Sequence, residues 1–203
     1  LSPDQDVSFP YNGKDPNILR AVKPTEFLQS DNKEIIDLAR HAVGGTQKAA
    51  KAAKQIESFV AGYIQQKDLS VGYASAAEVA QSRQGDCSEH AVLTAAMCRA
   101  VGIPARIVCG VLYVDSFVNQ KSIFGGHMWT EVYIGDQWIG LDATPTNQNN
   151  VNFGFGPGHI ALAHGDGSPS DFFNLVNTLG CFKIDNISVY REPEQMPQKA
   201  QSK

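Results

Sequence analysis

Between about residues 31 and 100 the chain places apolar side chains at intervals of three and four, a spacing typical of helices with one buried face. This pattern predicts helices over 31–43, 46–63 and 75–80. Over 87–101 apolar residues occupy nearly every side, so this fourth helix is expected to be buried at the centre of the fold. Gly102 and Pro104 are expected to end it, because glycine is favoured just past a helix and proline prevents its continuation.

Beyond residue 104 the chain becomes rich in β-branched and aromatic residues, which favour strands. Strands are predicted over 105–114, 127–134 and 137–142. The last two flank Gly135-Asp136, a dipeptide typical of a tight hairpin turn. A loop through about residue 158 is predicted next, then a helix near 170–177 and a strand near 181–190. Helices that precede strands favour an α+β fold with a mostly antiparallel sheet.

The chain has 203 residues, enough for one domain with a substantial core. Residues 1–30 are rich in proline, aspartate and asparagine and are interpreted as an extended lead-in or the end of a preceding domain. The predicted domain spans 31–191, and the polar segment 192–203 is predicted to be a flexible tail. Because the chain begins with Leu1 rather than Met, we interpret it as a piece of a longer protein. Its compartment and oligomeric state stay open, with an exported or periplasmic location favoured over a cytoplasmic one.

Composition excludes several classes of partner. Hydrophobic residues make up 42% and charged residues 19% of the chain, and the net charge is −4, as in an ordinary globular protein. No cluster of lysine and arginine is present to bind phosphates, so nucleic acid is not an expected partner. No apolar stretch reaches the roughly 20 residues needed to span a bilayer. Neither calcium nor any other metal is expected as a cofactor, because the sequence has no loop of alternating acidic ligands.

The strongest chemical signal is Cys87, which follows Gly85-Asp86 at the predicted start of the buried helix. Backbone N–H groups and the helix dipole at that position stabilise a thiolate, and the same N–H groups can bind an oxyanion. The alternative is a plain core cysteine. The other cysteines are at 98, 109 and 181, so a free Cys87 leaves at most one disulfide bond.

The predicted hairpin supplies two partners for this cysteine. With Gly135-Asp136 as the turn, Trp129 lies opposite Asp142, so His127 and Asp142 become diagonal neighbours on one face. Asp142 can then bind one ring nitrogen of His127, leaving the other to face Cys87. The three residues together predict a nucleophile, a base and an orienting carboxylate.

Four motifs carry a resemblance to a known family. They are Gly85-Asp86-Cys87, Arg99-Ala100-Val101-Gly102-Ile103-Pro104-Ala105-Arg106, His127-Met128-Trp129-Thr130-Glu131-Val132, and Trp138 through Asp142-Ala143-Thr144-Pro145. Their joint occurrence resembles the transglutaminase-like superfamily over roughly residues 30–190. The segment Gly-His-Ile-Ala-Leu-Ala over 158–163 is more similar to bacterial members, although Gly165-Asp166-Gly167 stands where they often carry an Arg-Asp pair.

The resemblance implies a papain-like, transglutaminase-core fold and a reaction without a cofactor. It implies that Cys87 is the nucleophile, His127 the general base and acid, and Asp142 the orienting carboxylate. We expect hydrolysis of a peptide or amide substrate, as in a protease or amidase. The open alternatives are a transglutaminase with an amine acceptor, a non-catalytic peptide-binding module, and a zinc-binding domain built on the Cys87-x-x-His90 spacing. Trp129, Trp138 and His159 are further candidates for substrate binding.

Overall fold

The computed structural model describes residues 7–66, 74–117, 120–145 and 154–165, together with 168, 170, 171, 173 and 177. The helices are α1 (Pro16–Arg20), α2 (Lys33–Val43), α3 (Ala49–Tyr63), α4 (Ala76–Ser82) and α5 (Cys87–Ala100). The strands are β1 (Ala105–Phe117), β2 (Gln120–Ile134), β3 (Gln137–Leu141) and β4 (His159–Gly165). Residues 170, 171, 173 and 177 are helical, whereas the predicted strand 181–190, Cys181 and the tail 192–203 lie outside the described residues.

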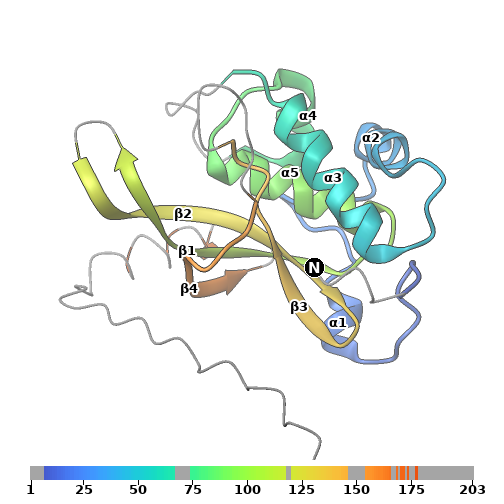
Figure 1. The fold of residues 1–203 in the computed structure, drawn as a ribbon. Coiled ribbons are helices and arrows are strands. Elements are labelled where there is room, and N and C mark those ends of the chain that lie inside the picture. The colour runs from blue at the N-terminus through green and yellow to red at the C-terminus, as the bar shows by residue number, and fades with distance from the viewer. Residues whose placement is uncertain are drawn as a thin grey trace, which may run out of the picture.

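Helices and strands form two layers. In Figure 1 the helices α2 to α5 lie on one side of the sheet, and α1 lies below the sheet. The predicted α+β class with an antiparallel sheet is therefore confirmed. None of the helices in the described part of the chain is long and apolar enough to cross a bilayer.

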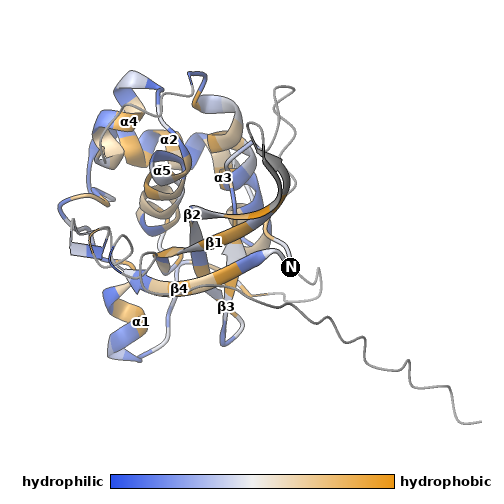
Figure 2. Cartoon of the chain, turned by 90° about the vertical axis from the view of Figure 1, so that its left-hand side faces the viewer, coloured by the Kyte–Doolittle hydropathy of each residue, from blue (hydrophilic) through white to orange (hydrophobic). Residues whose placement is uncertain are grey.

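Helix α5 lies at the centre of the helical layer, as its apolar sequence predicts. Side chains from Ser88 to Arg99 are all buried, which is the expected outcome for a helix that is apolar on every side. Figure 2 shows α2, α3 and α4 gathered around it. Thr130 on β2 donates a hydrogen bond from its hydroxyl to the carbonyl oxygen of Ala91 (2.8 Å), which ties α5 to the sheet.

The sheet has the strand order β3-β2-β1-β4, and every neighbouring pair is antiparallel. In the β2–β3 hairpin, Val132 pairs with Ile139 and Tyr133 pairs with Trp138. This is the register predicted from the Gly135-Asp136 turn. A shift of one residue would move every side chain of a strand to the other face, so the register decides which side of the sheet carries His127 and Asp142.

Strand β4 was not predicted: its residues follow the loop expected to end near residue 158, and no helix or strand was assigned to them. It pairs with β1 and is the outermost strand on that side of the sheet among the described residues, with a register irregularity between Cys109 and Gly110. Its sequence, His-Ile-Ala-Leu-Ala-His-Gly, lacks the β-branched residues that favour strands, apart from one isoleucine. Pairing with β1 overrides that weak local preference. It places His159 at the start of this outer strand.

Residues 7–30 pack against the rest of the domain rather than standing apart. Tyr11 donates its N–H to the carbonyl oxygen of Gly102 (2.9 Å), and Ala105 donates its N–H to that of Ala21 (2.9 Å). Leu28 is fully buried in the core, and Arg99 donates from Nη1 to the carbonyl oxygen of Lys23 (2.7 Å). This segment therefore contributes to the core on which the site is built.

Replacing Gly110 with alanine should lower the free energy of unfolding by about 1–3 kcal/mol, the usual cost of overpacking. An added Cβ would overlap the carbonyl oxygen of Ile160 on β4 and lie 2.7 Å from the Trp129 ring. Gly125 on β2 is a matched control, because a Cβ there meets nothing within 4 Å. Urea unfolding of both variants tests the prediction. Equal stability of the two would mean that β4 does not approach β1 this closely.

Candidate active site

Cys87 is the first residue of α5, and the residues around it fix the start of the helix. The carboxylate of Asp86 accepts the N–H groups of Ser88 and Glu89, while the Glu89 carboxylate accepts the N–H of Asp86 (2.9 Å) in return. This reciprocal capping box satisfies donors that a helix N-terminus leaves open. Gly85 has φ +151°, and a Cβ there would overlap the Glu89 side chain, so only glycine fits this turn.

The thiol of Cys87 lies beside the peptide bond that joins His127 to Met128, whose N–H favours the thiolate. Burial acts more strongly in the opposite direction and, together with the negative charges of Asp86, Asp142 and Glu89, raises the pKa of the thiol to about 12. Burial and these charges therefore oppose the stabilisation of a thiolate that the helix N-terminus favours. Two of the nearest helix N–H groups are already bound to Asp86, which removes much of their effect on Cys87.

Alkylation of Cys87 by iodoacetamide should follow this raised pKa. Because the thiolate is the reactive form, the rate should climb through the alkaline range and reach half its maximum well above the ordinary thiol pKa of about 8.5. Mass spectrometry of the peptide that contains Cys87, after timed labelling between pH 6 and 11, measures the profile. A plateau below pH 8 would contradict the prediction and would mean that His127 already holds the thiol proton in the resting protein.

His127 and Asp142 meet as the hairpin register predicts. Nε2 of His127 donates to Oδ2 of Asp142 over 2.8 Å, and Oδ1 of Asp142 accepts the N–H of Thr144 (2.9 Å). Asp142 is only 2% exposed, and burial by itself would raise its pKa. The hydrogen bonds from His127 and His159 outweigh burial and hold the pKa of this carboxyl well below its usual range. Asp142 is therefore ionised and can orient an imidazole ring.

His159 is the second histidine on the same carboxylate oxygen. Its Nε2 donates to Oδ2 of Asp142 over 3.0 Å, and its Nδ1 lies 3.0 Å from the carbonyl oxygen and 3.2 Å from the backbone nitrogen of Gly156. The rings of Phe155 and Trp129 flank it, with centroid distances of 4.7 and 5.2 Å. The sequence suggested His159 as a substrate-binding residue, and its contact with Asp142 was missed because β4 was not predicted.

Glu57 also contacts Asp142 and was missed entirely. This nearly buried residue of α3 accepts the backbone N–H of Asp142 at Oε1 (2.8 Å) and binds Nζ of Lys54 at Oε2 (2.6 Å). The available signal was an acidic residue between Ile56 and Val60 on the apolar face of the predicted helix. Buried carboxylates are uncommon unless they are paired, so such a position indicates a specific partner.

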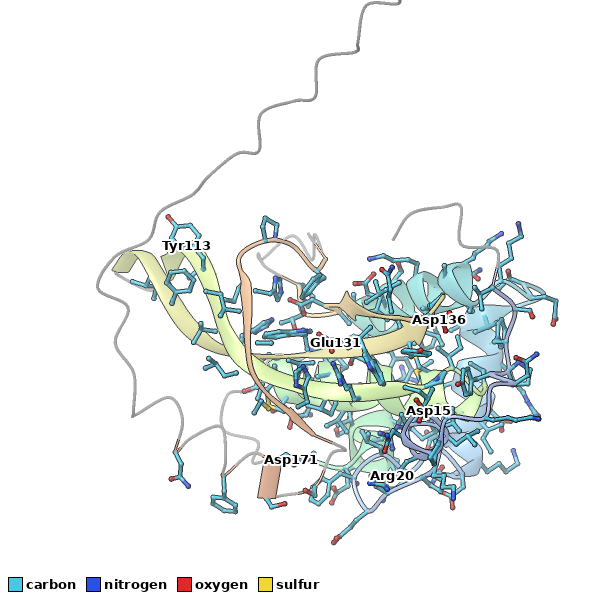
Figure 3. The ribbon with its side chains drawn as sticks, turned by 90° about the horizontal axis from the view of Figure 1, so that it is seen from below. Asp15, Arg20, Tyr113, Glu131, Asp136 and Asp171 are labelled. Atoms are coloured by element: carbon cyan, nitrogen blue, oxygen red, sulfur yellow. The ribbon has the colours of Figure 1, made fainter. Side chains whose placement is uncertain are left out.

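The two tryptophans occupy different surroundings. Trp129 is almost fully buried and stacks near His127, with ring centroids 6.2 Å apart. Trp138 instead lies beneath the guanidinium of Arg106, 4.0 Å from the ring centroid, and against Tyr133. Figure 3 shows this part of the sheet, with Glu131, the ion-pair partner of Arg106, in the middle and Asp136 at the turn. Trp129 is thus part of the candidate site, and Trp138 packs with a separate cluster.

Cys98 and Cys109 are free and buried, as is expected of small core residues, and Cys87 is free. Burial raises the pKa of both core thiols, which keeps them unreactive. The His90 ring lies within its own helix, with Nδ1 2.6 Å from the carbonyl oxygen of Asp86. That contact ties the ring to the first turn of α5 and does not favour a zinc site built on Cys87 and His90.

Comparison with known proteins agrees with this geometry. The family model of the transglutaminase-like superfamily matches residues 36–143. Human protein-glutamine gamma-glutamyltransferase 4 is 30% identical in an alignment of 110 residues that covers 40% of this chain and 16% of that protein. A crystal structure of a candidate cysteine protease from Cytophaga hutchinsonii superimposes with a TM-score of 0.65 and 26% identity, covering 81% of this chain and 52% of the other.

The chain thus spans about half of the Cytophaga structure and a smaller part of the human protein. The periplasmic domain of TgpA from Pseudomonas aeruginosa matches with 20% identity and a TM-score of 0.48, over 64% of this chain and 48% of that one. The family model covers more than half of the described domain and includes Cys87, His127 and Asp142. The chain belongs to the transglutaminase-like superfamily.

Proposed function

We propose that this protein is a cysteine-dependent acyl-transfer enzyme that hydrolyses a peptide or amide bond. The observation that carries the proposal is the meeting of three elements: Cys87 at the start of α5 lies beside the His127–Met128 peptide, and His127 is hydrogen-bonded to a buried, ionised Asp142. A thiol, an imidazole and an orienting carboxylate are the components that this chemistry needs.

In the proposed reaction, the substrate carbonyl binds next to a neutral Cys87 thiol. His127 uses the ring nitrogen not bound to Asp142, Nδ1, to accept the thiol proton as the Cys87 sulfur attacks the carbonyl carbon. The backbone N–H of Cys87 is a candidate oxyanion donor, since the capping box uses those of Ser88 and Glu89. His127 then gives the proton to the departing amine, which leaves a thioester on Cys87.

Water completes the reaction in the hydrolytic version. His127 takes a proton from water, the resulting hydroxide attacks the thioester carbon, and the acid product leaves as the Cys87 sulfur regains a proton. Phe155, which is 40% exposed and lies against the His159 ring, offers an apolar surface for a substrate side chain beside the site. Trp129 is almost fully buried against Phe155 and His159, so it supports this surface from within.

Transamidation is the second candidate, favoured by the 30% identity to a human protein named as a glutamyltransferase. Here a primary amine replaces water at the thioester. Hydrolysis is preferred because the Cytophaga structure named as a candidate protease covers far more of this chain.

One experiment separates the two reactions. The protein is incubated with a mixture of unfolded polypeptides and a biotin-labelled primary amine, and the products are identified by mass spectrometry. We expect new peptide termini that depend on Cys87. Amine incorporated at glutamine would establish transamidation instead, and no Cys87-dependent product of either kind would favour a peptide-binding module.

A further inference from the structure

His127, Asp142 and His159 each offer a ligand atom within 4.8 Å of those of the other two, and Nε2 of both histidines converges on Oδ2 of Asp142. We propose that this cluster binds a zinc-class divalent transition-metal ion, which acts as a reversible inhibitor and not as a cofactor. The inhibition rests on the proposed function, whereas the binding does not. The sequence expectation of no metal cofactor is compatible with this proposal, and no spacing motif could have found a site whose ligands come from three separate segments.

The donor set has the chemistry that zinc prefers. Two imidazole nitrogens and one carboxylate oxygen are the ligands of many catalytic zinc sites, which keep a further position open for water. Calcium and magnesium prefer oxygen ligands, so neither should compete effectively here. The Nε2 atoms lie 2.8 and 3.0 Å from Oδ2, whereas neighbouring ligands of a tetrahedral ion are about 3.4 Å apart at metal–ligand distances of about 2.1 Å. The two imidazole rings must therefore move away from Oδ2 by roughly half an ångström to admit the ion.

Asp142 is already oriented as a metal ligand would be. Its Oδ1 accepts the N–H of Thr144, and its backbone N–H is held by Glu57, so Oδ2 is the oxygen that faces the two histidines. Ligating carboxylates are usually held by such outer hydrogen bonds.

His159 is held in a way that suits both the free and the metal-bound state. In the free state Nε2 carries the proton toward Asp142, and Nδ1 accepts the N–H of Gly156 (3.2 Å). With metal on Nε2, the proton moves to Nδ1, which can donate to the carbonyl oxygen of Gly156 (3.0 Å). A metal-bound histidine almost always donates its other N–H to such an acceptor. Gly156 therefore supplies a hydrogen-bond partner for Nδ1 in both states.

Inhibition follows from the tautomer that the metal imposes on His127. When Nε2 binds the ion, the proton of a neutral ring resides on Nδ1. Nδ1 is the nitrogen that must accept the Cys87 proton in the proposed reaction, so it can no longer act as a base. Zinc therefore needs no bond to the Cys87 sulfur to stop the reaction.

Zinc chloride binding to the purified, metal-free protein is measured by equilibrium dialysis and by calorimetry. The wild type and Cys87→Ser should bind one equivalent with similar affinity, while His159→Gln should bind at least about tenfold more weakly. His164→Gln is the matched control: it changes a more exposed histidine on the same strand, whose ring faces Glu131, and it should bind as the wild type does. Calcium and magnesium should not displace the zinc.

A spectroscopic measurement keeps the proposal testable if His159→Gln fails to fold. Cobalt bound to the wild type should give visible ligand-field bands without the sulfur-to-metal charge-transfer band that a thiolate ligand adds. Loss of zinc binding in Cys87→Ser, a sulfur band with cobalt, or equal affinity in a folded His159→Gln would each overturn the proposal. None of these results depends on turnover, so they are distinct from failure of the proposed function, which would appear as Cys87-independent products.

Discussion

Replacing Cys87 with alanine should lower kcat on any confirmed substrate by at least about 10⁴-fold, because the variant has no nucleophile to form the thioester. The melting temperature should change little. The side chain packs against the edge of the core, and the capping box of Asp86 and Glu89 that starts α5 does not use it. Covalent trapping with a thiol-reactive substrate analogue, read by mass spectrometry, and thermal unfolding test both parts.

Cys98→Ala is the control on the same helix. Cys98 is fully buried, so its loss leaves a small cavity and should cost about 1–2 kcal/mol of stability while activity is retained. The two variants are therefore expected to show opposite effects. Cys87→Ala loses activity and keeps its stability, whereas Cys98→Ala keeps its activity and loses stability. Trapping at Cys98 or Cys109 in the Cys87→Ala variant would contradict the assignment of Cys87 as the nucleophile.

Local sequence was sufficient for the parts of the site that lie on one continuous element. The apolar run of α5 and the Gly102 that follows it fix where the helix ends, and Asp86 fixes where it begins. The Gly135-Asp136 turn fixes the register of the hairpin, because a two-residue loop allows a single set of opposite pairs. These local signals are what allowed His127 and Asp142 to be predicted as neighbours.

The contacts made by Glu57 and His159 could not be predicted in the same way. Glu57 lies on α3, 85 residues before Asp142 in the chain, and nothing in its own helix indicates which backbone N–H it accepts. His159 reaches Asp142 only because β4 pairs with β1, which is a tertiary preference that overrides weak strand propensity.

The protonation state of Cys87 could not be predicted from the sequence either. A helix N-terminus favours a thiolate, but burial and three neighbouring carboxylates oppose it, and their balance depends on distances and solvent exclusion. His127 must therefore remove a proton that the Cys87 thiol retains in the resting protein, a requirement that the motif alone did not indicate. That demand makes the orientation of the His127 ring, and so the state of Asp142, decisive for the rate.

Replacing Asp142 with asparagine should lower kcat by about 10³–10⁴-fold with the overall fold retained, as expected when the orienting carboxylate of a triad is lost. The amide keeps the shape of the side chain but can turn its NH₂ group toward Nε2 of His127. That ring would then carry its proton on Nδ1, the nitrogen that must accept the Cys87 proton. Asp136→Asn is the matched control on the same hairpin, where φ is +61° and asparagine is tolerated, and it should keep normal turnover.

The acid stability of the wild type and of Asp142→Asn tests the role of the Asp142 carboxylate without a substrate. An unfolded aspartate titrates near pH 3.9, whereas the pKa of Asp142 in the fold lies well below its usual range. The stability contributed by the ionised carboxylate is therefore present above about pH 4 and is lost as the pH falls further. In that lower range Asp142 is protonated in the unfolded chain while it is still ionised in the folded protein. The stability advantage of the wild type over Asp142→Asn should narrow as thermal melts are repeated from about pH 6 down to about pH 3. A difference that stays constant over this range, or turnover of Asp142→Asn near that of Asp136→Asn, would show that Asp142 does not hold His127 as the geometry indicates.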